Sequence, residues 1–231
     1  MKTQIIAIGG GAMSKNSETF PIERYALEQT GKVRPNVCFL SPATDDSDRN
    51  ILRFYEVFSH FTCERSHLSP LTAPSDIEFH IMSQDLIYVG GGPARNLLAF
   101  CYERQLDKIL LNAYQQGIVL AGISSGALCW FEEGLSYYTS SEFKPIHGLG
   151  FLKGSFCAHN NSEPSRRLRT EELVGQGLMK EGFAVDDDAA LHYIDNKLQH
   201  VISADPNGKA YEIIRTDDGV QQIEIKPDVL L

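Results

Sequence analysis

The 231-residue sequence predicts an α/β fold, a mostly parallel sheet flanked by helices. Short apolar runs alternate along the first half of the chain with longer, helix-like stretches. These runs are apolar throughout rather than at every second residue, which is typical of strands buried on both faces. Triple glycines end two of the runs, where a parallel strand turns toward the next helix. Together these observations indicate a sheet that helices cover on both sides.

The predicted elements follow a βαβα order in the first half and are less regular in the second. Strands are predicted at 4–11, 36–44, 85–93 and 118–122, then at 135–141, 183–195, 198–204 and 209–216. Helices are predicted at 21–31, 48–61, within 94–117, from 126 to 133 and over 164–180. No repeat or linker divides the chain, so residues 1–231 are expected to form a single domain.

The composition argues against several classes of partner. A net charge of −9 disfavours nucleic-acid and anionic-membrane binding, which both need excess Lys and Arg. The start of the chain does not resemble a signal peptide. Five widely spaced cysteines without a Cys-x-x-Cys pair are typical of free thiols in the cytoplasm. We therefore expect a cytoplasmic protein with no cofactor and no metal; a homodimer is compatible with the sequence, which does not specify oligomeric state.

The stretch 119–130, VLAGISSGALCW, contains a candidate nucleophile. Gly122 to Gly126 match G-x-S-x-G, after an apolar strand and before a helix-like segment. At such a sharp turn the backbones crowd together, and glycines relieve the crowding around the central serine. The pattern also arises by chance in ordinary turns, but the strand-turn-helix context favours Ser124 as a nucleophile.

Backbone amides near this turn are candidates for an oxyanion hole. The amide of Ser125 lies at a helix N-terminus, where negative charge is stabilised. Gly91 and Gly92 end the neighbouring strand, at the edge where ligands bind in parallel sheets. The alternatives are a turn that needs positive φ, or a dinucleotide site; neither glycine cluster completes G-x-G-x-x-G.

A serine nucleophile needs a base and a group that orients it. His159 is favoured among the seven histidines because a predicted strand end meets a polar loop there; His147 is the reserve, and His192 looks structural. Two acids are candidates, Glu142 in a loop and Asp187 within the run of three aspartates. We favour Asp187 narrowly, because the end of a core strand is more rigid, and expect the flanking aspartates to stay solvated.

The chain resembles the peptidase E (aspartyl dipeptidase) and cyanophycinase family of serine peptidases. The segments YVGGGPARNLL, AGISSGAL, FCAHNN and AVDDDAAL carry the resemblance, which covers most of the chain. It implies a peptidase E-like domain, similar in fold to class I glutamine amidotransferases, with Ser124 as nucleophile, His159 as base and Glu142 or Asp187 as acid. Ser125 stands where the family usually has alanine, and Pro93 where it usually has asparagine; the second departure weakens the expectation of an aspartyl preference.

The predicted function is hydrolysis of dipeptides or short peptides by a serine, histidine and acid, with an acidic residue as one candidate preference. Candidates for binding a substrate carboxylate are Arg95, Arg166, Arg167 and Arg169, although each could equally be a solvated helix charge. One alternative is an α/β-hydrolase-type esterase, which shares the G-x-S-x-G motif. Another is a non-catalytic small-molecule binding module on the same fold.

Overall fold

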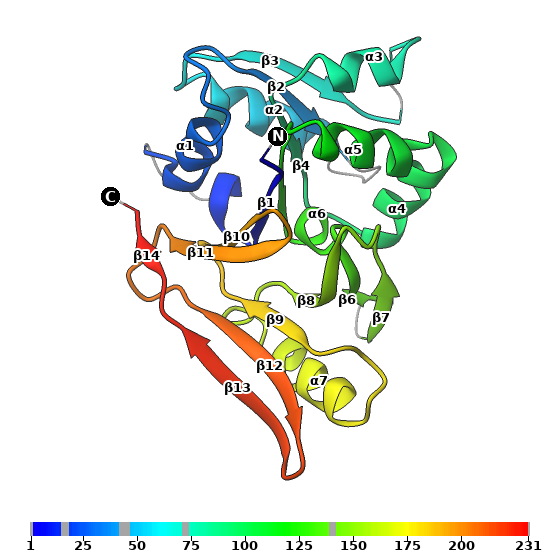
Figure 1. Cartoon of the computed structure of the whole chain (residues 1–231), viewed down its shortest axis with the longest axis vertical. Helices are drawn as coiled ribbons and strands as arrows, with labels where there is room; N and C mark the ends of the chain where they lie inside the picture. Colours follow the sequence, from blue (N-terminus) through cyan, green and yellow to red (C-terminus); the bar gives the residue numbers. More distant parts are fainter. Residues whose placement is uncertain (1, 15–18, 42–46, 71–73, 139–141, 231) are drawn as a thin grey trace.

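The computed structural model describes residues 2–14, 19–41, 47–70, 74–138 and 142–230. Two β-sheets lie one below the other, with helices around the larger one (Figure 1). Its strands run in the order β14-β11-β10-β1-β5-β4-β2-β3, and those of the smaller sheet in the order β13-β12-β9-β8-β6-β7. The α/β class is confirmed, and the second sheet is an addition that the sequence patterns did not predict.

The larger sheet is built on β1 and its parallel neighbours. Its strands are β1 (Gln4–Ile8), β2 (Asn36–Leu40), β3 (Glu64–Leu68), β4 (Leu86–Val89), β5 (Val119–Ile123), β10 (Ala189–Ile194), β11 (Lys197–Ser203) and β14 (Asp228–Val229). The pairs from β1 through β5, β4 and β2 to β3 are all parallel, whereas β10 is antiparallel to both β1 and β11. The carboxyl ends of β1, β4 and β5 therefore meet at one edge.

Helices cover both faces of this sheet. They are α1 (Pro21–Glu28), α2 (Ser47–Phe58), α3 (Ile77–Met82), α4 (Ala94–Glu103), α5 (Leu106–Gln115) and the short α6 (Ser125–Leu128), with a 3-10 turn at Ala12–Ser14. Alternate residues of β1 point to opposite cores: Ile6 and Ile8 pack with α1 and α2, and Ile5 and Ala7 with α3, α4 and α5. Burial on both faces explains why β1, β2, β4 and β5 are largely apolar, whereas the edge strand β3 is polar and partly exposed.

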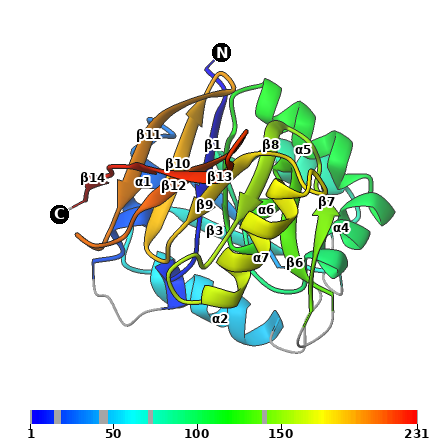
Figure 2. The same cartoon turned by 90° about the horizontal axis from the view of Figure 1, so that it is seen from below.

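The strands of the smaller sheet all come from the chain after residue 130, which also supplies β10, β11 and β14 to the larger sheet. The smaller sheet consists of β6 (Phe131–Tyr137), β7 (Phe143–His147), β8 (Leu152–Cys157), β9 (Gly182–Val185), β12 (Ala210–Thr216) and β13 (Gly219–Ile225). Helix α7 (Pro164–Gly175) packs on it through Leu173 and Val174. The view from below has α7 and this sheet nearest to the reader (Figure 2), and the β12–β13 hairpin projects away from the larger sheet (Figure 1).

Two predicted elements are wrong. The helix predicted over 126–133 ends at Leu128, and β6 begins at Phe131. The helix does not continue because the carbonyls of Cys129, Trp130 and Phe131 accept hydrogen bonds from the amides of Leu149, Leu152 and Gly150, respectively. The strand predicted over 183–195 is two strands, β9 and β10, which belong to different sheets. The strands predicted at 36–44 and 135–141 end in residues 42–44 and 139–141, which lie outside the described residues.

Candidate active site

The turn after β5 holds Ser124 in a strained conformation. Its backbone φ of 57° and ψ of −114° lie in a region that non-glycine residues rarely adopt, and α6 begins at the next residue. Glycine is required on both sides for space. A Cβ on Gly122 would lie 2.0 Å from the carbonyl oxygen of Gly126, and one on Gly126 would lie 2.2 Å from that of Val89. This is the geometry of a nucleophile elbow.

Ser124, His159 and Asp187 form a chain of hydrogen bonds. The Oγ of Ser124 lies 2.8 Å from Nε2 of His159, and Nδ1 of His159 lies 2.7 Å from Oδ1 of Asp187. Since an ionised carboxylate only accepts, Nδ1 carries the proton and Nε2 accepts from the serine. The side chains of His159 and Asp187 are 23% and 20% exposed, so the pair is within reach of a ligand.

Three segments distant in sequence bring these residues together. Ser124 follows β5, and His159 follows β8 with a left-handed backbone, φ 56°. Asp187 lies where the chain crosses from β9 in the smaller sheet to β10 in the larger. Its backbone amide donates to Oδ1 of Asn161, 2.9 Å away. Asn161 was not a predicted site residue. Its position two residues after His159 was the feature of the sequence that could have indicated a role beside the site.

The other predicted acids have different surroundings. Glu142 is exposed and pairs with Lys144 at 3.2 Å, so its carboxylate is engaged away from His159. Asp186 and Asp188 are 4% and 6% exposed, which corrects the expectation that they stay solvated. Asp186 accepts from Asn160 Nδ2 and from the amide of Lys209, and burial raises its pKa. These aspartates lie at the junction between the two sheets. The alternation of side chains along a strand applies within one sheet, so it does not predict their burial here.

The predicted oxyanion donors lie around Ser124. A Cβ on Gly91 would contact Cβ of Ser124 at 3.4 Å, which places the turn after β4 against the serine. Gly92 and Ser125 line the same pocket as Ser124. Within the described part of the chain, no acceptor is found for the amides of Gly91, Gly92 or Ser125. These donors are therefore available to a ligand beside the serine.

The pocket beside Ser124 has a volume of about 370 Å³. It is lined by Gly92, Pro93, Ser124, Ser125, Leu128, Leu135, Ser136, Tyr137, Ala158, His159, Glu163 and Arg166. Apart from His159, its charged or titratable groups are Glu163, Arg166 and the Tyr137 phenol. Burial raises the pKa of that phenol. Glu163 was missed as a site residue because sequence reasoning singled out only the arginines that follow it.

Of the predicted arginines, the structure places Arg166 in this pocket. Its guanidinium donates to Oε2 of Glu163 at 3.0 Å and to the carbonyl of Leu135 at 2.9 Å, and it stacks over the rings of Tyr137 and Phe143. Arg169 instead pairs with Glu172. Arg95 contacts the ring and carbonyl of Tyr138, and Arg167 is exposed. Neither these three nor the reserve base His147, which lies 3.9 Å from Glu133, lines the pocket.

His192 is structural, as predicted, and the cysteines, which were expected to be free thiols, also lie in the core. His192 is fully buried in β10, and its Nδ1 lies 2.8 Å from the hydroxyl of Tyr25. Burial lowers the pKa of His192 to about 4, so the ring is neutral near pH 7. The five cysteines are free and buried. Across the described residues, no group of three His, Cys, Asp or Glu side chains is arranged to hold a metal ion, and no helix is long and apolar enough to cross a membrane.

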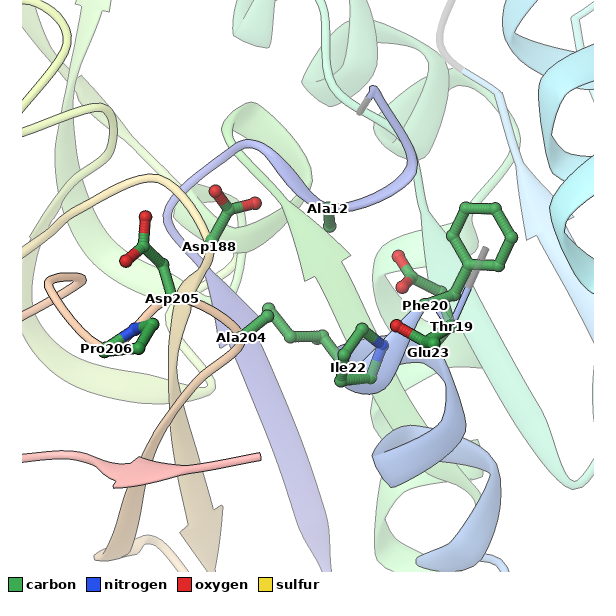
Figure 3. A pocket seen from close by; sticks show the side chains of 10 residues that line it. Ala12, Thr19, Phe20, Ile22, Glu23, Asp188, Ala204, Asp205 and Pro206 are labelled. Carbon is green, nitrogen blue, oxygen red and sulfur yellow. The ribbon is translucent and has the colours of Figure 1, made fainter. Parts of the chain in front are cut away.

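A second pocket, of about 230 Å³, lies on the other side of the turn after β1. Figure 3 shows Glu23 and Phe20 on one side of it and Asp188 and Asp205 on the other. Burial raises the pKa of Glu23 to about 7, and the charge of Asp188 acts in the same direction. Hydrogen bonds from Tyr88, at 3.2 Å, and from backbone amides act in the opposite direction. Glu23 is thus largely protonated in the fold at pH values where an unfolded chain would ionise it.

Glu23 is expected to make stability depend on pH. Between about pH 4.5 and 7 the unfolded chain loses this proton first, so the free energy of unfolding should fall as pH rises, then level off above 7. Glu23→Gln keeps a hydrogen-bonding partner for Tyr88 but cannot ionise. Relative to the unmodified chain, its free energy of unfolding should rise by roughly 3 kcal/mol as the pH goes from 4.5 to 8. Urea unfolding of both proteins at several pH values tests this, and parallel pH profiles would contradict it.

Comparison with known proteins places this chain in a family. The sequence model of Peptidase family S51 matches residues 5–201. An uncharacterized peptidase from Bacillus subtilis (strain 168), YgaJ, is 41% identical over 223 residues, which cover 96% of each chain.

Two solved structures share the fold. A peptidase from an acI-B1 Actinobacterium superposes with a TM-score of 0.74 at 16% identity, over 98% of this chain and 95% of its own. A putative peptidase E protein from Listeria monocytogenes EGD-e gives 0.61 at 15% identity, over 86% of this chain and 98% of its own. The family match over most of the chain agrees with the resemblance carried by the elbow and glycine motifs, and from it we conclude that this chain belongs to peptidase family S51 and is a serine-type peptidase.

Proposed function

We propose that the chain hydrolyses dipeptides or short peptides with a free amino terminus, using Ser124 as nucleophile, His159 as base and Asp187 as the orienting acid. The observation that carries this proposal is the unbroken hydrogen-bond chain from Ser124 Oγ through His159 to Asp187, at 2.8 and 2.7 Å. The same roles are supported by a serine held in a strained turn, beside backbone amides for which no acceptor is found among the described residues.

The reaction follows from these positions. His159 Nε2 takes the proton of Ser124 as Oγ bonds to the peptide carbonyl carbon, and the amides of Ser125 and of Gly91 or Gly92 stabilise the oxyanion. The imidazolium then gives its proton to the leaving nitrogen, the C–N bond breaks, and an ester to Ser124 remains. Water attacks that ester with His159 again as base, which releases the acid and restores the serine. Asp187 stabilises the imidazolium in both steps.

The pocket suggests a small substrate with an ammonium group. Its volume of about 370 Å³ is near the lower end for small-molecule sites. Tyr137 and Arg166 both donate to Oε2 of Glu163, and in the described part of the chain no donor is found for Oε1. The Glu163 side chain is 28% exposed, so Oε1 is a suitable acceptor for a peptide's α-ammonium.

A preference for acidic side chains is a separate hypothesis that rests on Arg166. The pairing with Glu163 cancels much of the positive charge of this guanidinium, which does not favour strong selection of acids. Comparing Asp-X with Asn-X dipeptides isolates the contribution of the charge. Equal rates for the two would remove the acidic preference and leave the peptidase assignment intact.

The test is turnover of a dipeptide library, with each peptide free and N-acetylated, together with labelling by a fluorophosphonate probe. We expect labelling of Ser124 and faster cleavage of the free peptides. Ester hydrolysis without peptide cleavage would favour the esterase alternative. Absence of labelling and of turnover would favour a binding module and overturn the proposal.

Glu163→Gln is expected to raise KM for free dipeptides. The amide oxygen can still accept from Tyr137 and Arg166, but the charge facing the ammonium is lost. A hydrogen bond between charged groups contributes about 1.5–3 kcal/mol, so KM should rise roughly 10- to 100-fold. N-acetylated peptides lack the ammonium and serve as the control, for which KM should change little. An equal effect on both peptide sets would show that Glu163 does not bind the amino terminus.

A further inference from the structure

The end of β1 and the turn that follows it, at residues 9–11, are hydrogen-bonded to the three segments that carry the proposed triad. The carbonyl of Ile8, at the end of β1, accepts from the amide of Ser124 at 2.9 Å. The next carbonyl, of Gly9, accepts from the amide of His159 at 3.3 Å, and that of Gly10 accepts from the amide of Asp188 at 2.8 Å. One strand end therefore anchors three segments that lie far apart in the sequence.

Gly10 lies directly against the hydrogen bond between His159 and Asp187. A Cβ built on Gly10 would lie 2.0 Å from Oδ1 of Asp187 and 2.5 Å from Nδ1 of His159. These two atoms are the ones joined by the 2.7 Å hydrogen bond. No side chain fits between the turn and the pair, so the backbone of Gly10 forms a wall that limits how far either side chain can shift.

The need for glycine at position 10 is one of space and not of backbone conformation. Gly11 has a φ of 79°, which favours glycine whatever surrounds it, but Gly10 is not among the residues with positive φ. Gly9 faces the carbonyl oxygens of Asp186 and Val185, which belong to the backbone. Among the three, Gly10 is therefore the one whose neighbours are the side chains of the proposed base and acid.

We propose that the turn at residues 9–11, with Gly10 at its centre, is a positioning element of the active site. By contact it sets the position of the His159–Asp187 pair relative to Ser124; none of its atoms enters the reaction. The inference rests on the proposed function. Its physical basis is that a displacement of about 1 Å in a catalytic group can lower turnover about 10²-fold.

Gly10→Ala tests the inference, with Gly175→Ala as the matched control. In Gly10→Ala the overlapping atoms belong to side chains, which can rotate away, so we expect a folded protein. Its kcat should fall about 10²-fold with little change in KM. Gly175 ends α7, and its Cβ would meet only the tip of the Val220 side chain at 3.0 Å, so Gly175→Ala should keep its kcat. Wild-type kcat in Gly10→Ala would overturn the inference.

A double-mutant cycle with Asp187→Ala separates positioning from general destabilisation. Asp187→Ala removes the atom nearest to the new Cβ and opens space into which the His159 ring, 2.5 Å from that Cβ, can move, so adding Gly10→Ala should lower kcat little further. If the loss of kcat in the double variant equalled the product of the losses in the two single variants, Gly10 would act elsewhere, and the inference would be overturned. If Gly10→Ala alone fails to fold, recovery of folding in the double variant supports the contact, and a failure of both contradicts it.

A spectroscopic measurement keeps this inference apart from the proposed function. The proton between His159 Nδ1 and Asp187 Oδ1 should give a far-downfield proton NMR signal in the free protein. We expect the signal to shift or disappear in Gly10→Ala and to persist in Gly175→Ala. An unchanged signal in Gly10→Ala refutes the positioning role even if the enzyme is active. A wild-type protein that neither labels nor cleaves peptides refutes the proposed function instead.

Discussion

Ser124→Ala is expected to abolish peptide hydrolysis, with a loss of kcat of about 10⁶-fold, as for removal of the nucleophile in other triads. Alanine removes the hydroxyl oxygen that lies 2.8 Å from His159 Nε2 and leaves the turn otherwise intact. The variant should stay folded, because a hydroxyl is replaced by hydrogen at the same backbone position. Steady-state turnover of a dipeptide and fluorophosphonate labelling measure the loss.

Ser125→Ala is the matched control for this prediction. The Oγ of Ser125 is buried and makes no hydrogen bond in the described structure, whereas its backbone amide is retained in alanine. Since a buried unpaired hydroxyl costs about 1 kcal/mol or more, the variant should be more stable by about that amount. Turnover should remain close to that of the unmodified enzyme. If Ser125→Ala abolished activity and Ser124→Ala retained it, the nucleophile would be misassigned.

Asp187→Asn is expected to lower kcat about 10⁴-fold, as loss of the orienting acid does in other triads. The amide cannot stabilise the imidazolium as a carboxylate does, and it offers an N–H to Nδ1, which favours the wrong tautomer of His159. The substitution is isosteric, so the unfolding midpoint serves as a check that the fold is retained. The decrease should appear in kcat more than in KM, because Asp187 does not line the pocket beside Ser124.

Glu142→Gln is the comparison that decides between the two candidate acids. Glu142 is exposed and paired with Lys144, and such surface pairs contribute roughly 0–1 kcal/mol to stability. We expect turnover within about twofold of the unmodified enzyme. A severe loss in Glu142→Gln together with normal turnover in Asp187→Asn would reverse the assignment of the acid. Normal turnover in both would indicate a dyad or a different chemistry.

The elbow could be predicted from the sequence because its constraints are local. A strand of five residues, a G-x-S-x-G turn and a helix start are all contained in residues 119–128, and the contact between Gly122 and Gly126 spans four positions. Four of the parallel strands, β1, β2, β4 and β5, were predictable for a related reason, since burial on both faces makes them largely apolar. The edge strand β3, with the sequence ERSHL, is partly exposed and was not predicted. The family resemblance rested on the elbow and on three other short segments, YVGGGPARNLL, FCAHNN and AVDDDAAL.

Which carboxylate lies beside His159, and what surrounds that pair, depend on the tertiary structure. Asp187 reaches His159 because the chain crosses there between two sheets, and no periodicity within 183–195 distinguishes one strand from two. The helix predicted after Leu128 gave way to pairing with residues 149–152, which lie about twenty positions away. Gly10 contacts the His159–Asp187 pair across separations of 149 and 177 positions. Such contacts depend on how separate elements pack against one another. Local sequence patterns do not predict them, because these patterns indicate only the conformation of each element by itself.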